Sequence, residues 1–336
     1  MRRAILAAAV SVAALCCMAG AKPQHDADAI VRLLNSRHSG SPRLYAAAAT
    51  TVAADAKRGK PVQQFILAVL ARDKDAPAAA KLDPETAKRY LAASASRIRE
   101  LAEKKNNPLA WYLLALEAND TKMLERAAQL GNVQAMNALA TMRLSDIIDG
   151  RDTTGDRDAT MAECRALFEK AAATGDANAL NNLALCHQNG FGGEKDEKKA
   201  LALFQKAADA GHSEAVNNLG RFYREGITVP KDLAKAARCF ETSAALGNVW
   251  GQLNYAAALM RGEGVKKNGR RAIELFESIA ARGVAEAMDI LARCHAEGMA
   301  GLPQDHSKAA VWRIRALAAR GDANAARWLE ANGEKK

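Results

Sequence analysis

Two Cys-His pairs are the residues of this sequence best suited to metal binding or nucleophilic catalysis. They are Cys186-His187 and Cys294-His295. Thiolates and imidazoles are zinc ligands, and a thiolate beside an imidazole can act as a nucleophile. The pairs lie far apart in the sequence, and neither has the C-x-x-C-H spacing of haem attachment. Their chemistry therefore depends on whether the fold brings the two pairs together.

The spacing of glycines reveals an internal repeat of 36 residues. One series has steps of 44, 36, 36, 36 and 38 residues, and a second has steps of 36 throughout. The first comprises Gly131, Gly175, Gly211, Gly247, Gly283 and Gly321, and the second comprises Gly190, Gly226, Gly262 and Gly298. Each period holds two helical stretches, such as residues 176–188 (helix A) and 197–210 (helix B). Such a short helix pair cannot bury its apolar face alone, so the spacing predicts stacked hairpins in an all-α solenoid.

The Cys-His pairs fall on the core positions of this repeat. Counted from the first glycine of each unit, Cys186 and Cys294 share offset +11 with Phe222, and both histidines share offset +12 with Tyr223. Three repeats separate the pairs by roughly 30 Å in a solenoid. They cannot share one metal ion, so we expect core packing, with no metal, cofactor or catalytic residue.

Several segments resemble a known repeat family. The matching pieces are NNLG followed by Phe222-Tyr223, then GITVPKD and AKAARCF. They are similar to Sel1-like repeats, relatives of tetratricopeptide repeats with a longer turn. The resemblance implies a right-handed α-solenoid of helix-turn-helix repeats over residues 107–336. Residues 22–106 read as a helical region, either degenerate repeats or a cap, with Asp83-Pro84 as a helix start.

Residues 1–21 are predicted to be a signal peptide. Arg2 and Arg3 precede an apolar run that extends from Ala4 to Leu15, and an A-x-A site ends at Ala21. We expect cleavage there and a periplasmic or secreted protein. Lipidation at Cys16 or Cys17 is the alternative, but the small residue that should precede a lipidated cysteine is missing. No later stretch has the roughly 20 apolar residues that span a bilayer.

Cysteines after the signal segment leave two possibilities open. Cys164 and Cys186 lie at equal distances before and after Gly175, so a hairpin there allows a disulfide, although buried free thiols also fit. Some cysteine-rich relatives carry cysteine pairs seven residues apart and are linked to β-lactam binding or hydrolysis. Here Ala172 and Ala179 occupy one such pair of positions, and no S-x-x-K or G-x-S-x-G motif is present. By analogy with these relatives, an enzyme acting on cell-wall or β-lactam-like substrates is the alternative function.

A polar face of helix A is the predicted binding surface, because helix A lines the concave side in related solenoids. Offsets +3, +6 and +10 share one side of that helix, here called the helix A face, and we expect them to be exposed. The candidate ligand-binding residues there are Asn137, Asn178, Asn181, Glu214, Asn217, Arg221, Trp250, Asp289 and Arg293. Asn182, Asn218 and Asn254 at offset +7 are expected to tie neighbouring helices together.

The charge favours an acidic partner only mildly. The formal net charge is +10, spread along the chain, and no basic run is interleaved with aromatic residues. We expect no nucleic-acid binding, no transmembrane segment and a monomer. The sequence therefore predicts a non-enzymatic scaffold or adaptor of the bacterial envelope that binds a protein or peptide.

Overall fold

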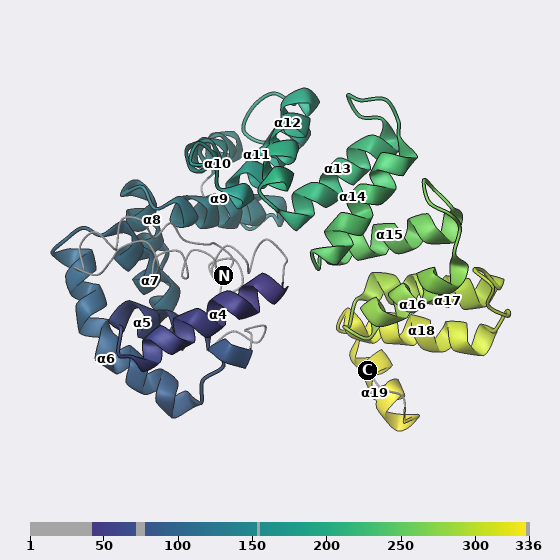
Figure 1. The fold of residues 1–336 in the computed structure, drawn as a ribbon, viewed down its shortest axis with the longest axis horizontal. Helices are drawn as coiled ribbons and strands as arrows, with labels where there is room; N and C mark the ends of the chain where they lie inside the picture. Colours follow the sequence, from purple (N-terminus) through teal and green to yellow (C-terminus); the bar gives the residue numbers. More distant parts are fainter. Residues whose placement is uncertain (1–41, 72–77, 153–154, 334–336) are drawn as a thin grey trace. The chain divides into compact units, whose positions relative to one another are not determined.

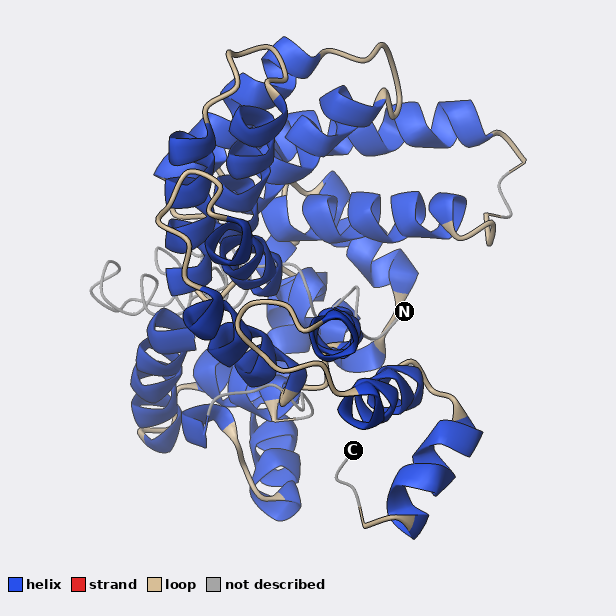
Figure 2. Ribbon diagram, turned by 90° about the vertical axis from the view of Figure 1, so that its right-hand side faces the viewer, coloured by secondary structure: helices blue, strands red, loops and turns tan. Residues whose placement is uncertain are grey.

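The structure is a computed structural model that describes residues 42–71, 78–152 and 155–333. These residues form sixteen α-helices and one short 3₁₀ helix, and no strand occurs among them (Figure 2). The predicted all-α solenoid is confirmed. The chain divides into two compact units, Met1–Ala215 and Val216–Lys336. No helix in the described ranges is both long enough and apolar enough to cross a membrane.

The described N-terminal part of the first unit is helical. Its elements are α4 (Pro42–Lys57), α5 (Pro61–Leu70), η1 (Ala78–Ala80), α6 (Pro84–Glu103), α7 (Pro108–Ala118) and α8 (Thr121–Gln129) (Figure 1). Asp83 caps α6, because its carboxylate accepts a hydrogen bond from the Thr86 amide at 2.9 Å. The predicted signal peptide, Cys16, Cys17 and residues 22–41 of the predicted helical region lie outside the described residues, and the boundary at 106/107 stays a prediction.

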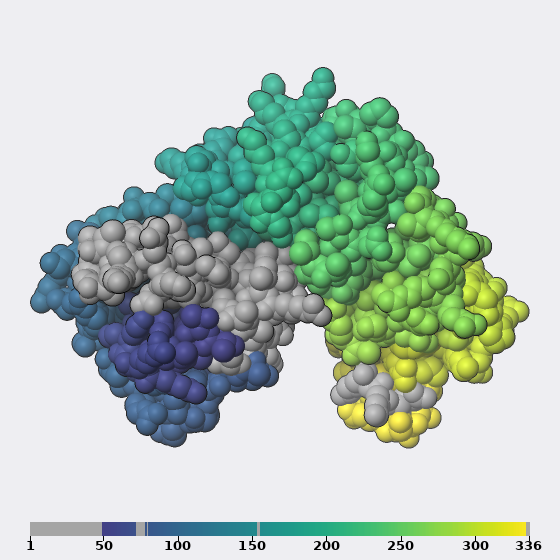
Figure 3. Space-filling view, viewed as in Figure 1, coloured from purple at the N-terminus to yellow at the C-terminus, as the bar shows by residue number. Residues whose placement is uncertain are grey.

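The remaining helices follow the repeat. They are α9 (Val133–Ile148), α10 (Arg157–Ala172), α11 (Ala177–Asn189), α12 (Glu197–Asp209), α13 (Ser213–Glu225), α14 (Leu233–Ala245), α15 (Val249–Arg261), α16 (Gly269–Ala280), α17 (Ala285–Glu297), α18 (His306–Ala319) and α19 (Ala323–Ala331). Odd numbers are A helices and even numbers are B helices. Within each unit, successive segments of the chain follow one another in sequence order across the surface seen in Figure 3.

Local capping explains where these helices begin and end. Asp176 accepts a hydrogen bond from the Ala179 amide at 2.9 Å, and Asp196 does the same for Lys199. Such side chains satisfy amide groups that the first helical turn leaves without partners. Gly190 ends α11 with a left-handed conformation (φ 76°), which a residue without a Cβ adopts without strain.

The core is a stripe of phenylalanines packed beside small residues. Phe168, Phe204, Phe240 and Phe276, which belong to α10, α12, α14 and α16, are each 2% exposed or less. Burying each ring contributes about 2 kcal/mol. In the second unit the residue of α15 that packs against Ser243 of α14 must be small, since a Cβ on Gly251 would lie 2.4 Å from the Ser243 Oγ.

Two of the long turns, those before α12 and α16, pack against the preceding helix B and leave no room for a side chain at one position. A Cβ on Gly192 would lie 2.3 Å from the Met161 carbonyl oxygen, and one on Gly264 would lie 1.9 Å from that of Leu233. In the last such turn the roles are exchanged. Ala300 takes the left-handed position (φ 58°), and Gly269 on the opposite helix leaves the space.

We expect Gly264→Ala to lower the free energy of unfolding by at least about 2 kcal/mol, because left-handed strain and overlap with the Leu233 carbonyl add together. Gly283→Ala is the matched control, since Gly283 has a similar φ of 83° but nothing within 4 Å of its Cβ position. The control should lose only about 1 kcal/mol. Urea denaturation measures both, and equal losses would contradict the proposed close approach.

Candidate functional site

The asparagines at offset +6 of the helix A face are buried, so the expectation of exposure there is wrong. Asn137, Asn181 and Asn217 are 6%, 1% and 5% exposed. Their neighbours explain this, because Asn182 Nδ2 donates to Asn137 Oδ1 at 2.9 Å and Asn254 Nδ2 donates to Asn217 Oδ1 at 2.8 Å. These amide pairs join consecutive A helices, as expected for the residues at offset +7.

At offset +3 of the first unit, Asn178 and Glu214 lie near the surface, whereas Gln134 is 3% exposed. Asn178 is half-buried, and Glu214 is exposed. Desolvation raises the pKa of the Glu214 carboxyl, and a hydrogen bond from the Asn181 side chain opposes that rise.

His212 caps α13, a role that Asp176, Asn132 and Asn248 have in other repeats. The Ala215 amide donates to His212 Nδ1 at 3.2 Å, so that nitrogen carries no proton. The other nitrogen, Nε2, therefore donates to Asn178 Oδ1 at 3.0 Å. Burial lowers the pKa of His212 to about 4. One neutral imidazole thus connects a helix start to a candidate binding residue.

In the second unit the helix A face offers one aromatic and two cationic side chains. Trp250 is 54% exposed. Arg221 is half-buried and Arg293 is exposed, and neither forms an ion pair or hydrogen bond with another described residue. Asp289 is occupied, because its carboxylate accepts a hydrogen bond from Arg320. Trp250, Arg221 and Arg293 are therefore the candidate residues of this unit that are left for a partner.

The helix A face of the first unit contains an apolar hollow that the sequence did not predict. It has a volume of about 210 Å³ and is lined by Thr141, Leu144, Ser145, Ile148, Phe168, Asn182 and Leu185. Ile148 is 61% exposed. The helix α9 has 16 residues where α11 has 13, so its additional last turn supplies Ile148. The longer step from Gly131 to Gly175 was the available signal.

The Cys-His pairs pack in the core, as expected. Cys186 and Cys294 are 1% exposed or less, and Cys294 Sγ lies 3.8 Å from Met260 Sδ. His187 lies beside Arg165, whose Nη2 is 3.1 Å from the ring Nδ1. Among the described residues, no three histidine, cysteine or acidic side chains are grouped to hold a metal ion.

Cys164 and Cys186 are free thiols in the structure, not a disulfide. Desolvation raises the pKa of Cys164 to about 11 and that of Cys186 to about 12. The charge of each thiolate would also repel the other, because Cys164 contributes to the raised pKa of Cys186. Both thiols therefore stay protonated at neutral pH and are poor nucleophiles.

The repeat is also found by comparison with known proteins. The family model of the Sel1 repeat matches residues 177–212, 213–248, 251–284 and 285–319. This chain is a Sel1-like repeat protein. A Sel1 repeat protein from Oxalobacter formigenes is 24% identical over 70% of this chain and 94% of that chain, with a TM-score of 0.53. That likeness shows the shared fold.

The Sel1-like chain also matches c5321, a protective antigen of uropathogenic Escherichia coli strains that is described as having an SLR fold. The identity is 21%, over 84% of this chain and 67% of that chain, with a TM-score of 0.47. No curated protein matches the sequence significantly. Each matched repeat spans all or most of one A helix and the whole of the following B helix, for example α11 and α12 in residues 177–212.

We expect acid to destabilise this Sel1-like protein through His212. The pKa of His212 is about 4 when folded and about 6.5 when unfolded, so the unfolded chain binds more protons between these values. Stability is complete above pH 6.5 and is lost as the pH falls toward 4, by about 2 kcal/mol at pH 5. Urea denaturation at pH 7 and pH 5 measures the loss.

The control for this prediction is His212→Asn, which keeps a capping side chain of the type found in neighbouring repeats but removes the titrating group. From pH 7 to pH 5, the free energy of unfolding of wild type should fall by about 2 kcal/mol more than that of the variant. If both proteins lose the same free energy of unfolding, His212 is not the group responsible.

Proposed function

We propose that this protein is a non-catalytic scaffold that binds an acidic peptide segment of a partner protein through the helix A face of its second unit. Sel1 repeats form surfaces suited to protein–protein interaction. The observation that supports the proposal is the exposed Trp250, which shares this face with two arginines that have no ion pair. Tryptophan and arginine are the residue types that dominate binding energy at protein interfaces.

The charges favour a partner with carboxylates next to an aromatic or aliphatic side chain. Arg221 belongs to α13, Trp250 to α15 and Arg293 to α17, so each A helix of a run of three contributes one group. A guanidinium can donate two parallel hydrogen bonds to a carboxylate. The net charge of +10 supports the same choice of partner. An extended peptide that crosses successive A helices could contact all three groups.

We further propose that the protein acts in the bacterial envelope, exported by the N-terminal segment that ends at Ala21, and is either periplasmic or secreted. This rests on the positive start, the apolar run and the A-x-A site before Lys22.

The raised pKa values of Cys164 and Cys186 favour a binding role over thiol catalysis.

We expect peptides selected by display of random dodecapeptides on the purified protein to be rich in Asp or Glu beside an apolar residue. Trp250→Ala should weaken the best peptide at least tenfold, because it removes the aromatic anchor. Arg221→Ala combined with Arg293→Ala should reduce both the affinity and its dependence on salt. Fluorescence polarisation measures both effects.

Matched controls lie elsewhere on the second unit. Trp328 is 40% exposed on α19, and Arg313 is exposed on α18, so Trp328→Ala and Arg313→Ala should leave the affinity unchanged. Selected peptides that bind Trp250→Ala as tightly as wild type would refute the proposed surface. Circular dichroism checks that every variant keeps its helical content.

A further inference from the structure

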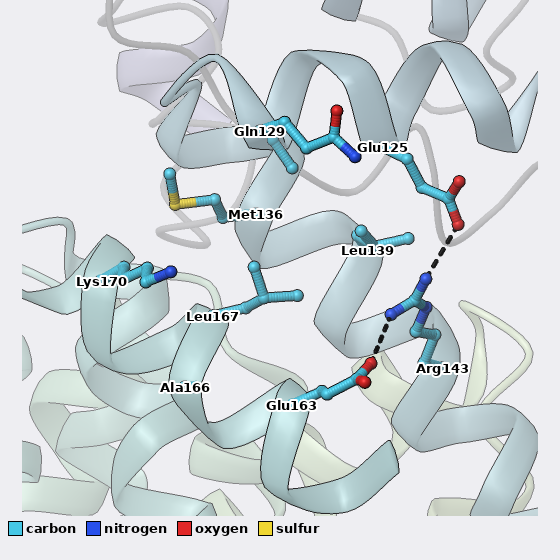
Figure 4. A pocket seen from close by; sticks show the side chains of 10 residues that line it. Glu125, Gln129, Met136, Leu139, Arg143, Glu163, Ala166, Leu167 and Lys170 are labelled. Atoms are coloured by element: carbon cyan, nitrogen blue, oxygen red, sulfur yellow. Dashed lines mark hydrogen bonds and ion pairs between the residues drawn. The ribbon is translucent and has the colours of Figure 1, made fainter. Parts of the chain in front are cut away.

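A second groove lies in the first unit, away from the helix A face. It is formed by α8, α9 and α10 and has a volume of about 560 Å³ (Figure 4). Its floor is buried and apolar, with Leu139 and Ala128 at 4% and 5% exposure, and Met136 and Leu167 are half-buried. This volume is within the range of ligand sites.

Helix length and small side chains create the groove. Both α8 and α10 pack on α9. The helix α8 has only nine residues, whereas α10 has sixteen. Ala128 of α8 and Ala166 of α10 line the groove with one methyl group each, and Ala166 is exposed. The space between the two B helices is therefore left open above the side chains of α9.

One end of the groove is closed by an ion-pair cluster. Arg143 of α9 reaches Glu125 of α8 at 2.8 Å and Glu163 of α10 at 3.1 Å (Figure 4). The Arg143 side chain is 30% exposed, and its guanidinium has carboxylates on two sides. The cluster links all three helices and carries a net charge of −1. Arg143 is thus already paired, and this end of the groove repels a second anion.

The other end carries a cation without a partner. Lys170 lies at the opposite end of the groove from Arg143 (Figure 4). Lys170 and the amide of Gln129 are exposed, and neither forms a hydrogen bond or ion pair with another described residue. The groove therefore has apolar walls, a negative end and a positive end. An occupant that complements it has an apolar body with a carboxylate on the side of Lys170.

We propose that this groove binds a peptide segment of a protein partner in which a leucine- or methionine-sized side chain lies close to an aspartate or glutamate. The apolar side chain packs on Leu139, Met136 and Leu167, and the carboxylate pairs with Lys170. Exposed residues such as Ala166 and Gln129 form the rim of the groove. The groove can therefore accept one side chain of a peptide whose backbone stays at the surface. A free fatty acid would need enclosure of most of its surface. The site does not depend on the binding surface around Trp250.

Methyl NMR of ¹³C-methionine-labelled protein tests this directly, because Met136 lines the groove and Met260 is buried in the second unit. Met136→Leu and Met260→Leu assign the two signals. The probes are the capped pentapeptide Gly-Leu-Gly-Glu-Gly, the same peptide with Gln for Glu, and decanoate. We expect the Glu peptide to shift the Met136 signal saturably and to leave Met260 unchanged. The Gln peptide should bind at least fivefold more weakly.

Variants separate the groove from general effects. Lys170→Gln should weaken the Glu peptide at least fivefold, and Ala166→Phe should abolish its effect by filling the groove. Lys206→Gln is the matched control, since exposed Lys206 has the same repeat position on α12, and it should change nothing. Trp250→Ala should also change nothing, which distinguishes this site from the proposed function.

Three results would overturn the proposal. The first is a Met136 signal unaffected by the Glu peptide at millimolar concentration. The second is equal affinity for the Glu and Gln peptides, or for wild type and Lys170→Gln, because the carboxylate would then have no role. The third is a shift by decanoate alone, which would assign the groove to a small amphiphile in place of a peptide.

Discussion

Burial of each helix hairpin against the next hairpin is the constraint on which the structure depends. A helix of 13 residues is marginal in water, and the phenylalanines of α10, α12, α14 and α16 are covered only when two hairpins stack. Because the same contact recurs in every repeat, position in the repeat decides whether a residue is buried. The two Cys-His pairs illustrate this, since their offset places all four side chains in the core. The position of a residue in the repeat is therefore a better guide to its role than its residue type.

Polar groups between repeats follow the same rule. The amide pairs Asn182–Asn137 and Asn254–Asn217 recur in the two units and join neighbouring A helices. Departures from the repeat pattern are therefore informative about function, because packing between repeats does not require them. His212 replaces an acidic or amide cap, the longer α9 creates an apolar hollow, and the short α8 leaves room for a groove. The surfaces proposed for binding are the groove, which is one of these local exceptions, and the helix A face around the exposed Trp250.

The fold could be predicted from the sequence because its signals are local and repeated. Glycine spacing, N-terminal caps such as Asp83 and Asp196, and the small-beside-large pattern each indicate the same hairpin. Exposure along helix A could not be predicted fully. Asn137 and Asn217 appear as surface residues by helical period, but their burial depends on an amide of the adjacent repeat.

The groove beside Lys170 was equally invisible in the sequence. Its existence depends on the lengths of α8 and α10 and on how both pack on α9, and its charge depends on Arg143 pairing with two helices at once. Trp250 and Arg293, in contrast, lie at exposed offsets where periodicity was sufficient. Periodicity therefore predicts which face a residue occupies, whereas pairing between neighbouring repeats decides whether that face is free.

The most direct test of the account is the far-ultraviolet circular dichroism of a synthetic single repeat, residues 248–283, at neutral pH without organic cosolvent. This segment contains α15 and α16 and the buried Phe276, but none of the neighbours that cover its apolar face. We expect the spectrum of a mostly unfolded peptide, because one hairpin cannot bury its own core. A spectrum with the helical content that these residues have in the whole chain would contradict the dependence of each hairpin on the next.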